Sequence, residues 1–418
     1  MHDKSLSIMS AALLAVSLVV TVMTPGAWAQ SNYKSLYKFT GGQDGGEPQA
    51  GLISDQAGNL YGTTAVGGAN KNGTVFQLAP NSDGSWTESV LHSFCSGGGC
   101  ADGSTPLAGL ILDQTGSLYG TTPMGGAYGE GTVFKLTPTE DGSWTENVLW
   151  SFTGGRDGAE PYCELTLDLS GNLYGTTSNG GVYGSGTVFE LTPHSGADWT
   201  ESVLYDFTTS GDYGGSAYAG VILDAEGNLY GTTEIGGADN EGSVFELKPT
   251  RKGVWTISVL HSFTGGRDGG RTSSGNLVMD ATGNLYGTTV FGGIYEYGAA
   301  FKLTQSSGKW QETVIHSFTG RRDGATPVAG LTFDSAGNLY GTTQQGGNLS
   351  RCQDGCGTVF KLVPNTNGGW SETVLHDFFD HPGDSPAGGV TFGAAGNLYG
   401  TTLGDGITSE GSVFEVTP

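Results

Sequence analysis

The sequence predicts an all-β fold, a seven-bladed β-propeller with four antiparallel strands in each blade. Three observations predict it. The segment Gly-Asn-Leu-Tyr-Gly-Thr-Thr occurs seven times with one substitution, Ser117, and successive copies begin 54 to 59 residues apart. Each repeat contains four short runs of apolar and β-branched residues, separated by glycine-rich turns, and no repeat shows a helical period. Repeats of this length, read as four strands each, are typical of propeller blades.

The second repeat shows the four strands in order. An apolar run at Gly109–Asp113 predicts a buried inner strand, and a tight turn leads to the second strand at Leu118–Thr122. A glycine-rich loop precedes the third strand at Thr132–Thr137. An Asp-Gly pair, which is typical of hairpins, precedes the fourth strand at Trp144–Phe152. A parallel β-helix is the alternative architecture, but its turns are much shorter than these repeats.

The two ends of the repeat region predict how the ring closes. Leu36–Phe39 matches the fourth strand of the other repeats, whereas the chain ends on a third strand, Val413–Val416. We therefore expect the N-terminal strand to complete the last blade, which removes an exposed sheet edge. In this arrangement the inner strands surround a central channel. The loops between strands two and three and between successive blades share one end of the ring, the loop-rich rim, where we expect function to reside.

The first 29 residues carry the features of a secretory signal peptide. Lys4 precedes an apolar stretch, Ala11–Val22, and the triplet Ala27-Trp28-Ala29 provides a cleavage site before Gln30. We expect residues 30–418 to form the propeller in the extracellular space or the periplasm. An uncleaved membrane anchor is the alternative, but the apolar stretch is short for a membrane span.

Net charge restricts the partners. The formal charge of −24 disfavours nucleic acids and anionic membrane surfaces, both of which require basic patches. An acidic surface is compatible with cations, basic partners or neutral sugars. After signal cleavage we expect no membrane insertion, and we expect a monomer.

Three repeated motifs resemble a known family. Gly-Asn-Leu-Tyr-Gly-Thr-Thr, Gly-Thr-Val-Phe-Lys-Leu and Ser-Phe-Thr-Gly-Gly-x-Asp-Gly resemble the tandem-repeat proteins called choice-of-anchor GloVer-containing proteins, over essentially all of the chain after the signal peptide. The resemblance implies a secreted bacterial repeat protein, often with a C-terminal surface anchor, and implies no activity. This chain ends at Pro418 directly after a repeat strand, which leaves anchoring open. The Asp-x-x-Gly-Asn-Leu-Tyr turn alone also resembles hairpins in lactone hydrolases and a lyase.

Repeated aspartates, histidines and tryptophans are expected to serve the fold. The aspartate that ends six of the seven inner strands, with Gly393 in its place in the last, is expected to accept hydrogen bonds within its turn. A second series on the rim also favours turn stabilisation, with calcium binding as the alternative: Asp44, Asp102, Asp157, Asp212, Asp268, Asp323 and Asp384. One outer-strand position holds His, Tyr or Trp in different repeats, so it favours ring packing over metal ligation. No cofactor is predicted.

Five cysteines predict two local disulfides. Cys95 with Cys100, and Cys352 with Cys356, each close a short loop on the rim, as is common in exported proteins. Cys163 is left over and is expected to be buried and inert.

Departures from the repeat give the candidate site. Where most repeats have small residues at the channel mouth, two have Glu164 and Asn276, which would place polar groups in the channel. Glu164 is the candidate acid or base, supported by Arg156, Asp157 and Glu160 in its loop. Rim aromatic rings would stack on sugars: Tyr128, Tyr162, Tyr183, Tyr218 and Tyr295. Neutral drift among repeats is the alternative explanation.

Three functions are compatible with these features. The favoured one is a secreted protein that binds a glycan or a protein at the loop-rich rim. The alternatives are an extracellular polysaccharide lyase or hydrolase that uses Glu164, and a cell-surface structural module.

Overall fold

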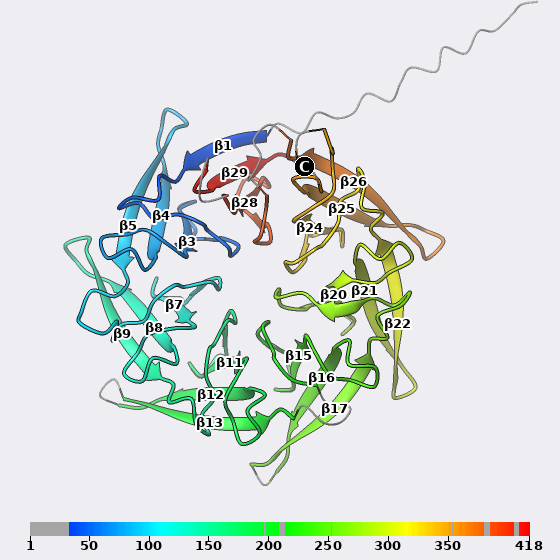
Figure 1. Ribbon diagram of the computed structural model, residues 1–418, viewed down its shortest axis with the longest axis horizontal. Coiled ribbons are helices and arrows are strands. Elements are labelled where there is room, and N and C mark those ends of the chain that lie inside the picture. Colours follow the sequence, from blue (N-terminus) through cyan, green and yellow to red (C-terminus); the bar gives the residue numbers. More distant parts are fainter. Residues whose placement is uncertain are drawn as a thin grey trace, which may run out of the picture. The chain divides into compact units, whose positions relative to one another are not determined.

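The propeller is present as predicted. The computed structural model describes residues 33–195, 198–208, 214–251, 253–350, 352, 354–379, 385–404 and 409–418. These residues contain 29 β-strands and no helix, and the strands form seven antiparallel sheets arranged as the blades of a ring (Figure 1). The proposed signal peptide lies outside the described residues. No helix among the described residues has the length and apolar character needed to cross a membrane.

Each blade is one sheet, numbered here in chain order. Blade 1 comprises β2 (Ile53–Ser54), β3 (Leu60–Thr64), β4 (Thr74–Pro80) and β5 (Trp86–Ser93). The next blades are blade 2, with β6 (Ile111–Leu112), β7 (Leu118–Thr122), β8 (Thr132–Pro138) and β9 (Trp144–Ser151); blade 3, with β10 (Thr166–Leu167), β11 (Leu173–Thr177), β12 (Thr187–Pro193) and β13 (Trp199–Asp206); and blade 4, with β14 (Ile222–Leu223), β15 (Leu229–Thr233), β16 (Ser243–Pro249) and β17 (Trp255–Ser262). The last blades are blade 5, with β18 (Gly270–Thr272), β19 (Val278–Met279), β20 (Leu285–Phe291), β21 (Ala299–Ser306) and β22 (Lys309–Ser317); blade 6, with β23 (Thr332–Phe333), β24 (Leu339–Thr343), β25 (Thr358–Pro364) and β26 (Trp370–Asp377); and blade 7, with β27 (Thr391–Phe392), β28 (Leu398–Thr402), β29 (Ser412–Val416) and β1 (Tyr33–Lys38).

The N-terminal strand closes the ring. β1 pairs antiparallel with β29, with Tyr33 opposite Val416 and Lys38 opposite Ser412. Blade 7 therefore takes three strands from the end of the chain and its outer strand from the beginning (Figure 1). The predicted closure is confirmed, and with it the assignment of loops to the two rims.

The repeated aspartate stabilises its hairpin, as predicted. In blade 1 the Asp55 carboxylate accepts hydrogen bonds from the backbone N–H groups of Ala57 and Asn59, both at 2.9 Å. It also accepts bonds from the Asn59 amide at 2.7 Å and the Tyr61 hydroxyl at 3.0 Å. The Asn and Tyr of the repeated motif are therefore partners of this aspartate, because they satisfy the remaining lone pairs of a partly buried carboxylate.

The other motif residues pack the blades together. A side chain at Gly62 would lie 2.7 Å from both Leu52 and Phe76, so only glycine fits beneath the core phenylalanine. The Thr63 hydroxyl donates to the carbonyl of Ala108 in the next blade at 3.0 Å. This hydrogen bond is a polar link between neighbouring blades at the channel mouth.

Aromatic contacts fill the remaining space between blades. Trp144 of blade 2 meets Tyr61 of blade 1 edge-on at 6.2 Å between ring centroids. The outer-strand histidine His92 packs edge-on against Phe94 at 4.8 Å. The outer-strand position serves ring packing, as the exchange of His, Tyr and Trp among repeats predicts. Its polar ring atoms also bind the rim aspartates, which ring packing alone does not predict, as His92 does with Asp102 and Tyr37 with Asp44.

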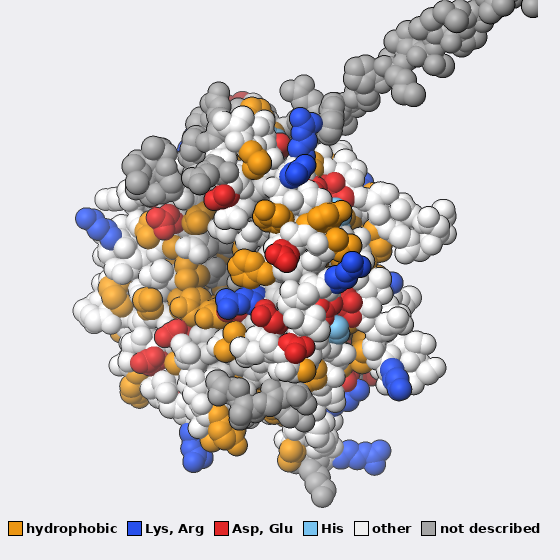
Figure 2. Space-filling view, turned by 45° about the vertical axis from the view of Figure 1, so that its right-hand side comes forward, with side chains coloured by type: hydrophobic (Ala, Val, Ile, Leu, Met, Phe, Trp, Pro, Cys, Tyr) orange, Lys and Arg blue, Asp and Glu red, His pale blue; other side chains and the backbone are white. Residues whose placement is uncertain are grey.

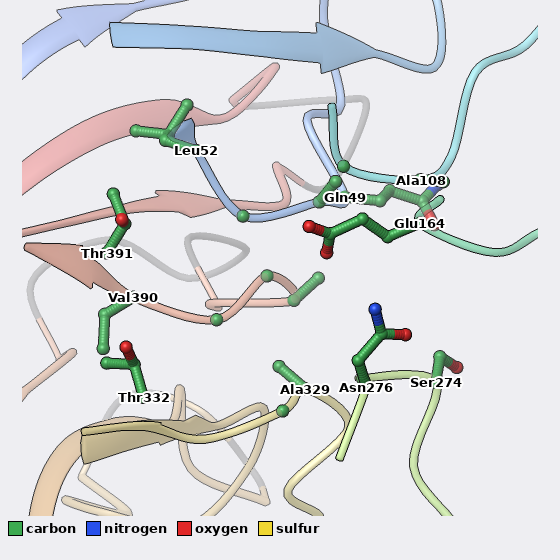
Figure 3. A pocket seen from close by; sticks show the side chains of 18 of the residues that line it. Gln49, Leu52, Ala108, Glu164, Ser274, Asn276, Ala329, Thr332, Val390 and Thr391 are labelled. Atoms are coloured by element: carbon green, nitrogen blue, oxygen red, sulfur yellow. The ribbon is translucent and has the colours of Figure 1, made fainter. Parts of the chain in front are cut away.

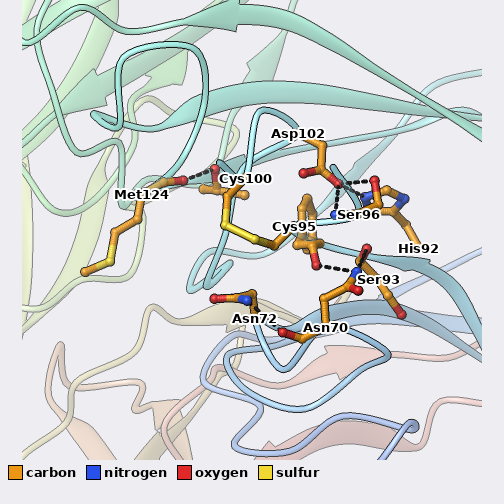
Figure 4. Close-up of a disulfide and its surroundings, with 11 residues drawn as sticks. Asn70, Asn72, His92, Ser93, Cys95, Ser96, Cys100, Asp102 and Met124 are labelled. Carbon is orange, nitrogen blue, oxygen red and sulfur yellow. Dashed lines mark hydrogen bonds and ion pairs between the residues drawn. A yellow bond between two sulfur atoms is a disulfide. The ribbon is translucent and has the colours of Figure 1, made fainter. Parts of the chain in front are cut away.

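The disulfides form as predicted, between Cys95 and Cys100 and between Cys352 and Cys356. Figure 4 shows the first beside Asp102, whose carboxylate accepts hydrogen bonds from Ser96 and contacts His92. Because Ser96 and His92 both bind Asp102 through the same oxygen and not each other, this is no catalytic triad. Cys163 is buried and free, and burial raises the pKa of its thiol to about 11.

Candidate functional site

A cavity of about 380 Å³ lies at the centre of the ring, lined by residues of all seven blades. Figure 2 shows a hollow there with hydrophobic side chains around it. Most lining residues come from the chain just before the inner strands, where the repeats have Ala or Gly. These small residues let adjacent blades approach closely at the channel mouth, since a side chain added to Gly51 would lie 3.2 Å from the Gly389 carbonyl.

Glu164 places a carboxylate in this cavity. It stands where the neighbouring blade has Gly109, and a side chain added to that glycine would lie 3.2 Å from the Glu164 carboxylate oxygen. Figure 3 shows the carboxylate directed into the cavity. It is partly accessible to channel water but enclosed by protein, and burial raises its pKa to about 7. Among the described residues it has no hydrogen-bond or ion-pair partner.

Asn276 lines the cavity at the position equivalent to Glu164, in a blade that has one extra residue. Residues 269–278 of blade 5 correspond to residues 214–222 of blade 4. The Asn276 side-chain oxygen accepts a hydrogen bond from the Gly220 N–H at 2.7 Å. Its amide nitrogen then remains as a donor, and Figure 3 shows the amide directed toward the same space as Glu164.

The extra residue also leaves one threonine unpaired. Six of the seven motif threonines donate to a carbonyl at the channel mouth of the next blade: Thr63, Thr121, Thr176, Thr288, Thr342 and Thr401. The seventh, Thr232 of blade 4, is buried and its hydroxyl has no partner. The channel mouth of blade 5 is therefore displaced from the position that the other blades share.

Two tyrosines flank the cavity on blades 3 and 4. Tyr162 lines the cavity, and its ring centroid lies 5.2 Å from that of Tyr218. The Tyr162 hydroxyl donates to Glu160 at 3.5 Å. Both rings are half-buried, and burial together with nearby carboxylates raises the pKa of each hydroxyl, which keeps them neutral.

The row of polar and aromatic side chains continues onto blade 5. Glu234 lies near Tyr218, where its charge contributes to the raised tyrosine pKa. Arg271 contacts Glu234 at 3.8 Å and lies over the Phe291 ring at 6.0 Å. We call the cavity residues Glu164 and Asn276, with Tyr162, Tyr218, Glu234 and Arg271, the blade 3–5 site.

A positive-φ backbone conformation that recurs in the repeats fixes the position of two rim residues. Glu160 and Arg271 occupy equivalent positions with φ of 53° and 49°, which L-residues rarely adopt. The Glu160 N–H donates to the Glu130 carbonyl of the previous blade at 2.9 Å, and the Arg271 N–H donates to Glu241 at 2.8 Å. These bonds to the preceding blade compensate the backbone strain and fix where the two side chains leave the rim.

The other predicted residues lie elsewhere. Asp157 accepts bonds from the Thr153 backbone at 2.9 Å and from the Trp150 indole, at the outer end of the loop. Arg156 is exposed beside it and does not line the cavity. Tyr128, Tyr183 and Tyr295 stand 52–63% exposed on the loops between second and third strands.

No metal-binding cluster of side chains is evident among the described residues. Among the residues that the structure describes, no group of three or more His, Cys, Asp or Glu side chains is arranged to hold a metal ion. The described rim aspartates instead bind their own turns, as Asp44 does through the Thr40 N–H at 2.9 Å. Asp212 and Asp384 lie outside the described residues.

Sequence reasoning missed Glu234 and Arg271. Arg271 differs from its counterparts Glu47, Thr105 and Ser216, and it lies beside the extra residue of blade 5. A comparison of repeat lengths would have drawn attention to it. Glu234 carries no such signal, because the loop that holds it varies in every blade.

One of the solved structures that resemble this chain supports a shared fold. An ulvan lyase of polysaccharide lyase family PL25 is similar over 91% of this chain and 95% of its own, with 10% identity and a TM-score of 0.54. A protein of unknown function from Dyadobacter fermentans covers 92% of this chain and 98% of its own, with 11% identity and a TM-score of 0.43. The similarity to the lyase concerns the fold alone. Comparison with curated proteins found no match.

The repeats themselves identify the family. The model of the Gloeobacter/Verrucomicrobia repeat matches residues 21–146, 82–280 and 253–418, which together span the propeller. The two disulfides are consistent with an extracellular protein. The chain therefore belongs to the Gloeobacter/Verrucomicrobia repeat family.

Proposed function

We propose that this protein is an extracellular glycan-binding propeller, and that the glycan binds at the channel mouth on blades 3 to 5. One observation carries the proposal. The channel-mouth position that five blades fill with glycine holds Glu164 on blade 3 and Asn276 on blade 5. The side chains beside them contact one another, as in the Tyr162–Tyr218 pair at 5.2 Å and the Arg271–Glu234 pair at 3.8 Å.

The chemistry of the blade 3–5 site suits a sugar. Half-buried aromatic rings stack on the apolar faces of sugar rings while their hydroxyls stay hydrated. Glu164 offers hydrogen-bond acceptors and the Asn276 amide offers donors, which together match the dual character of sugar hydroxyls. A cavity of about 380 Å³ is large enough for a sugar unit and falls in the range of small-molecule sites.

The test is a glycan array followed by calorimetry with the purified protein. We expect Tyr162→Ala with Tyr218→Ala to weaken binding by at least about tenfold, since each stacking ring contributes roughly 1 kcal/mol or more. Leu169→Ala is the matched control, because Leu169 is fully exposed on a hairpin of the opposite rim. Binding that survives the double substitution would refute the proposed site.

An enzyme is the second candidate. Burial raises the pKa of Glu164 to about 7, which suits a general acid or base, and the Tyr162 hydroxyl lies on the same cavity. A solved propeller of this architecture is a polysaccharide lyase, although fold likeness alone transfers no activity. Glycans that bind on the array are incubated with the protein and with the Glu164→Gln variant, which distinguishes an enzyme from a binding protein. Cleavage that is lost in the variant supports the enzyme, and binding without cleavage supports the binding protein.

A further inference from the structure

The cavity is electrostatically unbalanced. Glu164 is the one charged side chain among the described residues that line it, and no Lys, Arg or His is among them. Arg271 is the cation at the blade 3–5 site, and it already contacts Glu234 at 3.8 Å. An enclosed carboxylate without a partner is costly, because nothing replaces the water that it loses.

We propose that the glycan carries a protonated amine, and that this amine binds Glu164 inside the cavity. This inference rests on the proposed function and specifies its ligand class, an amino sugar. The carboxylate would regain a charge-assisted hydrogen bond, and the ammonium group would supply donors where Glu164 has only acceptors. The Asn276 amide, anchored through the Gly220 N–H at 2.7 Å, would bind a neighbouring hydroxyl.

Two alternatives are less well matched to the cavity. A metal ion would need several ligands, and the described residues provide no such cluster there. A lysine side chain of a protein would satisfy the carboxylate but would leave the tyrosine pair at the mouth without a sugar ring to stack on. The acidic chain, with a formal charge of −24, favours the approach of any cation.

Proton release makes the proposal measurable. A carboxyl with a pKa near 7 is mostly protonated at about pH 6. An ammonium group that binds it requires the charged carboxylate, so binding at this pH expels about one proton. A neutral sugar in the same place would expel none.

The experiment is calorimetry at about pH 6 in buffers of different ionisation enthalpy. The ligands are a short oligosaccharide of glucosamine, which is protonated at this pH, and its fully N-acetylated counterpart. We expect the glucosamine oligomer to bind at least about tenfold more tightly and to release about one proton. Glu164→Gln should abolish both the preference and the release. Glu226→Gln, an exposed change on the opposite rim, should alter neither.

The outcomes distinguish this inference from the function on which it rests. Equal binding of both oligomers without proton release would overturn the amine assignment and leave glycan binding intact. If neither oligomer binds, propylammonium is titrated while the Glu164 carboxyl resonance is followed by NMR. A lowered Glu164 pKa would then overturn the amino-sugar assignment in favour of a lysine side chain. An unchanged pKa would overturn amine binding altogether.

Discussion

Glutamates between the blades lower the stability of the ring at neutral pH. Five outer strands carry a glutamate with one buried carboxyl oxygen that lacks a hydrogen-bond partner: Glu88, Glu146, Glu201, Glu312 and Glu372. Burial, followed by the charge of a rim aspartate on the preceding blade, raises each pKa to about 7 or 8. Blade 4 has Ile257 at the same position, so the position also accepts an apolar residue.

The sign of the pH effect follows from Glu372. Its pKa rises from 4.5 to about 7 on folding. Below pH 4.5 both states are protonated and the group does not oppose folding. As pH rises toward 7 the unfolded chain loses its proton first, so stability falls. The full shift corresponds to about 3 kcal/mol. Because the side chain is partly exposed, water reduces this loss to roughly 1 kcal/mol.

The variant Glu372→Gln removes the charge and keeps the shape. We expect it to stabilise the protein by roughly 1 kcal/mol at about pH 8 and to have no effect at about pH 4. Urea denaturation of both proteins at the two pH values measures this, with Glu226→Gln as the exposed control. Equal stability changes at both pH values would refute the reasoning, since a pure packing effect does not depend on protonation.

Three further predictions use the repeats as internal controls. Thr176→Val removes the hydroxyl that donates to Ala219 at 2.8 Å and should lower the free energy of unfolding by about 1–2 kcal/mol. Thr232→Val removes a hydroxyl without a partner and should leave the stability unchanged or raise it. Urea denaturation of the two variants measures both effects. Replacing Cys95 and Cys100 by serine should cost about 2 kcal/mol, and an equal midpoint of unfolding before and after replacement would contradict this. Cys163 should react with a thiol reagent only after unfolding, because it is buried and its pKa is raised to about 11.

The repeat made the architecture predictable. Asp55 could be placed in its hairpin because six of the seven copies of this turn carry the same carboxylate. β1 could be placed beside β29 because the last repeat lacks a fourth strand. Glu164 could be found because a glycine position in the other repeats holds a charge. The regular pattern carried the information for Asp55, and departures from it carried the information for β1 and Glu164.

The shape of the rim was less predictable. Asp157 shares a loop with Glu164, and the sequence therefore suggested a common site. That loop runs from the outer strand to the channel, so Asp157 lies at its outer end with Thr153. Glu234 and Arg271 lie far apart in sequence and meet only because adjacent blades bring their loops together. Such contacts depend on how blades are placed beside each other, which no single repeat encodes.

The extra residue of blade 5 links stability to the proposed site. It displaces the channel mouth, which leaves the Thr232 hydroxyl without a partner and allows Asn276 to reach Gly220. Deletion of Ser274 should restore the spacing of the other blades and with it the threonine bond, raising stability by about 1 kcal/mol. The same deletion should weaken glycan binding, because the displaced segment that holds the Asn276 amide against the Gly220 N–H would move. A deletion variant that is more stable and still binds glycan would show that the displaced channel mouth of blade 5 serves no ligand. A deletion variant that is less stable would show that blade 5 has adapted to its longer segment.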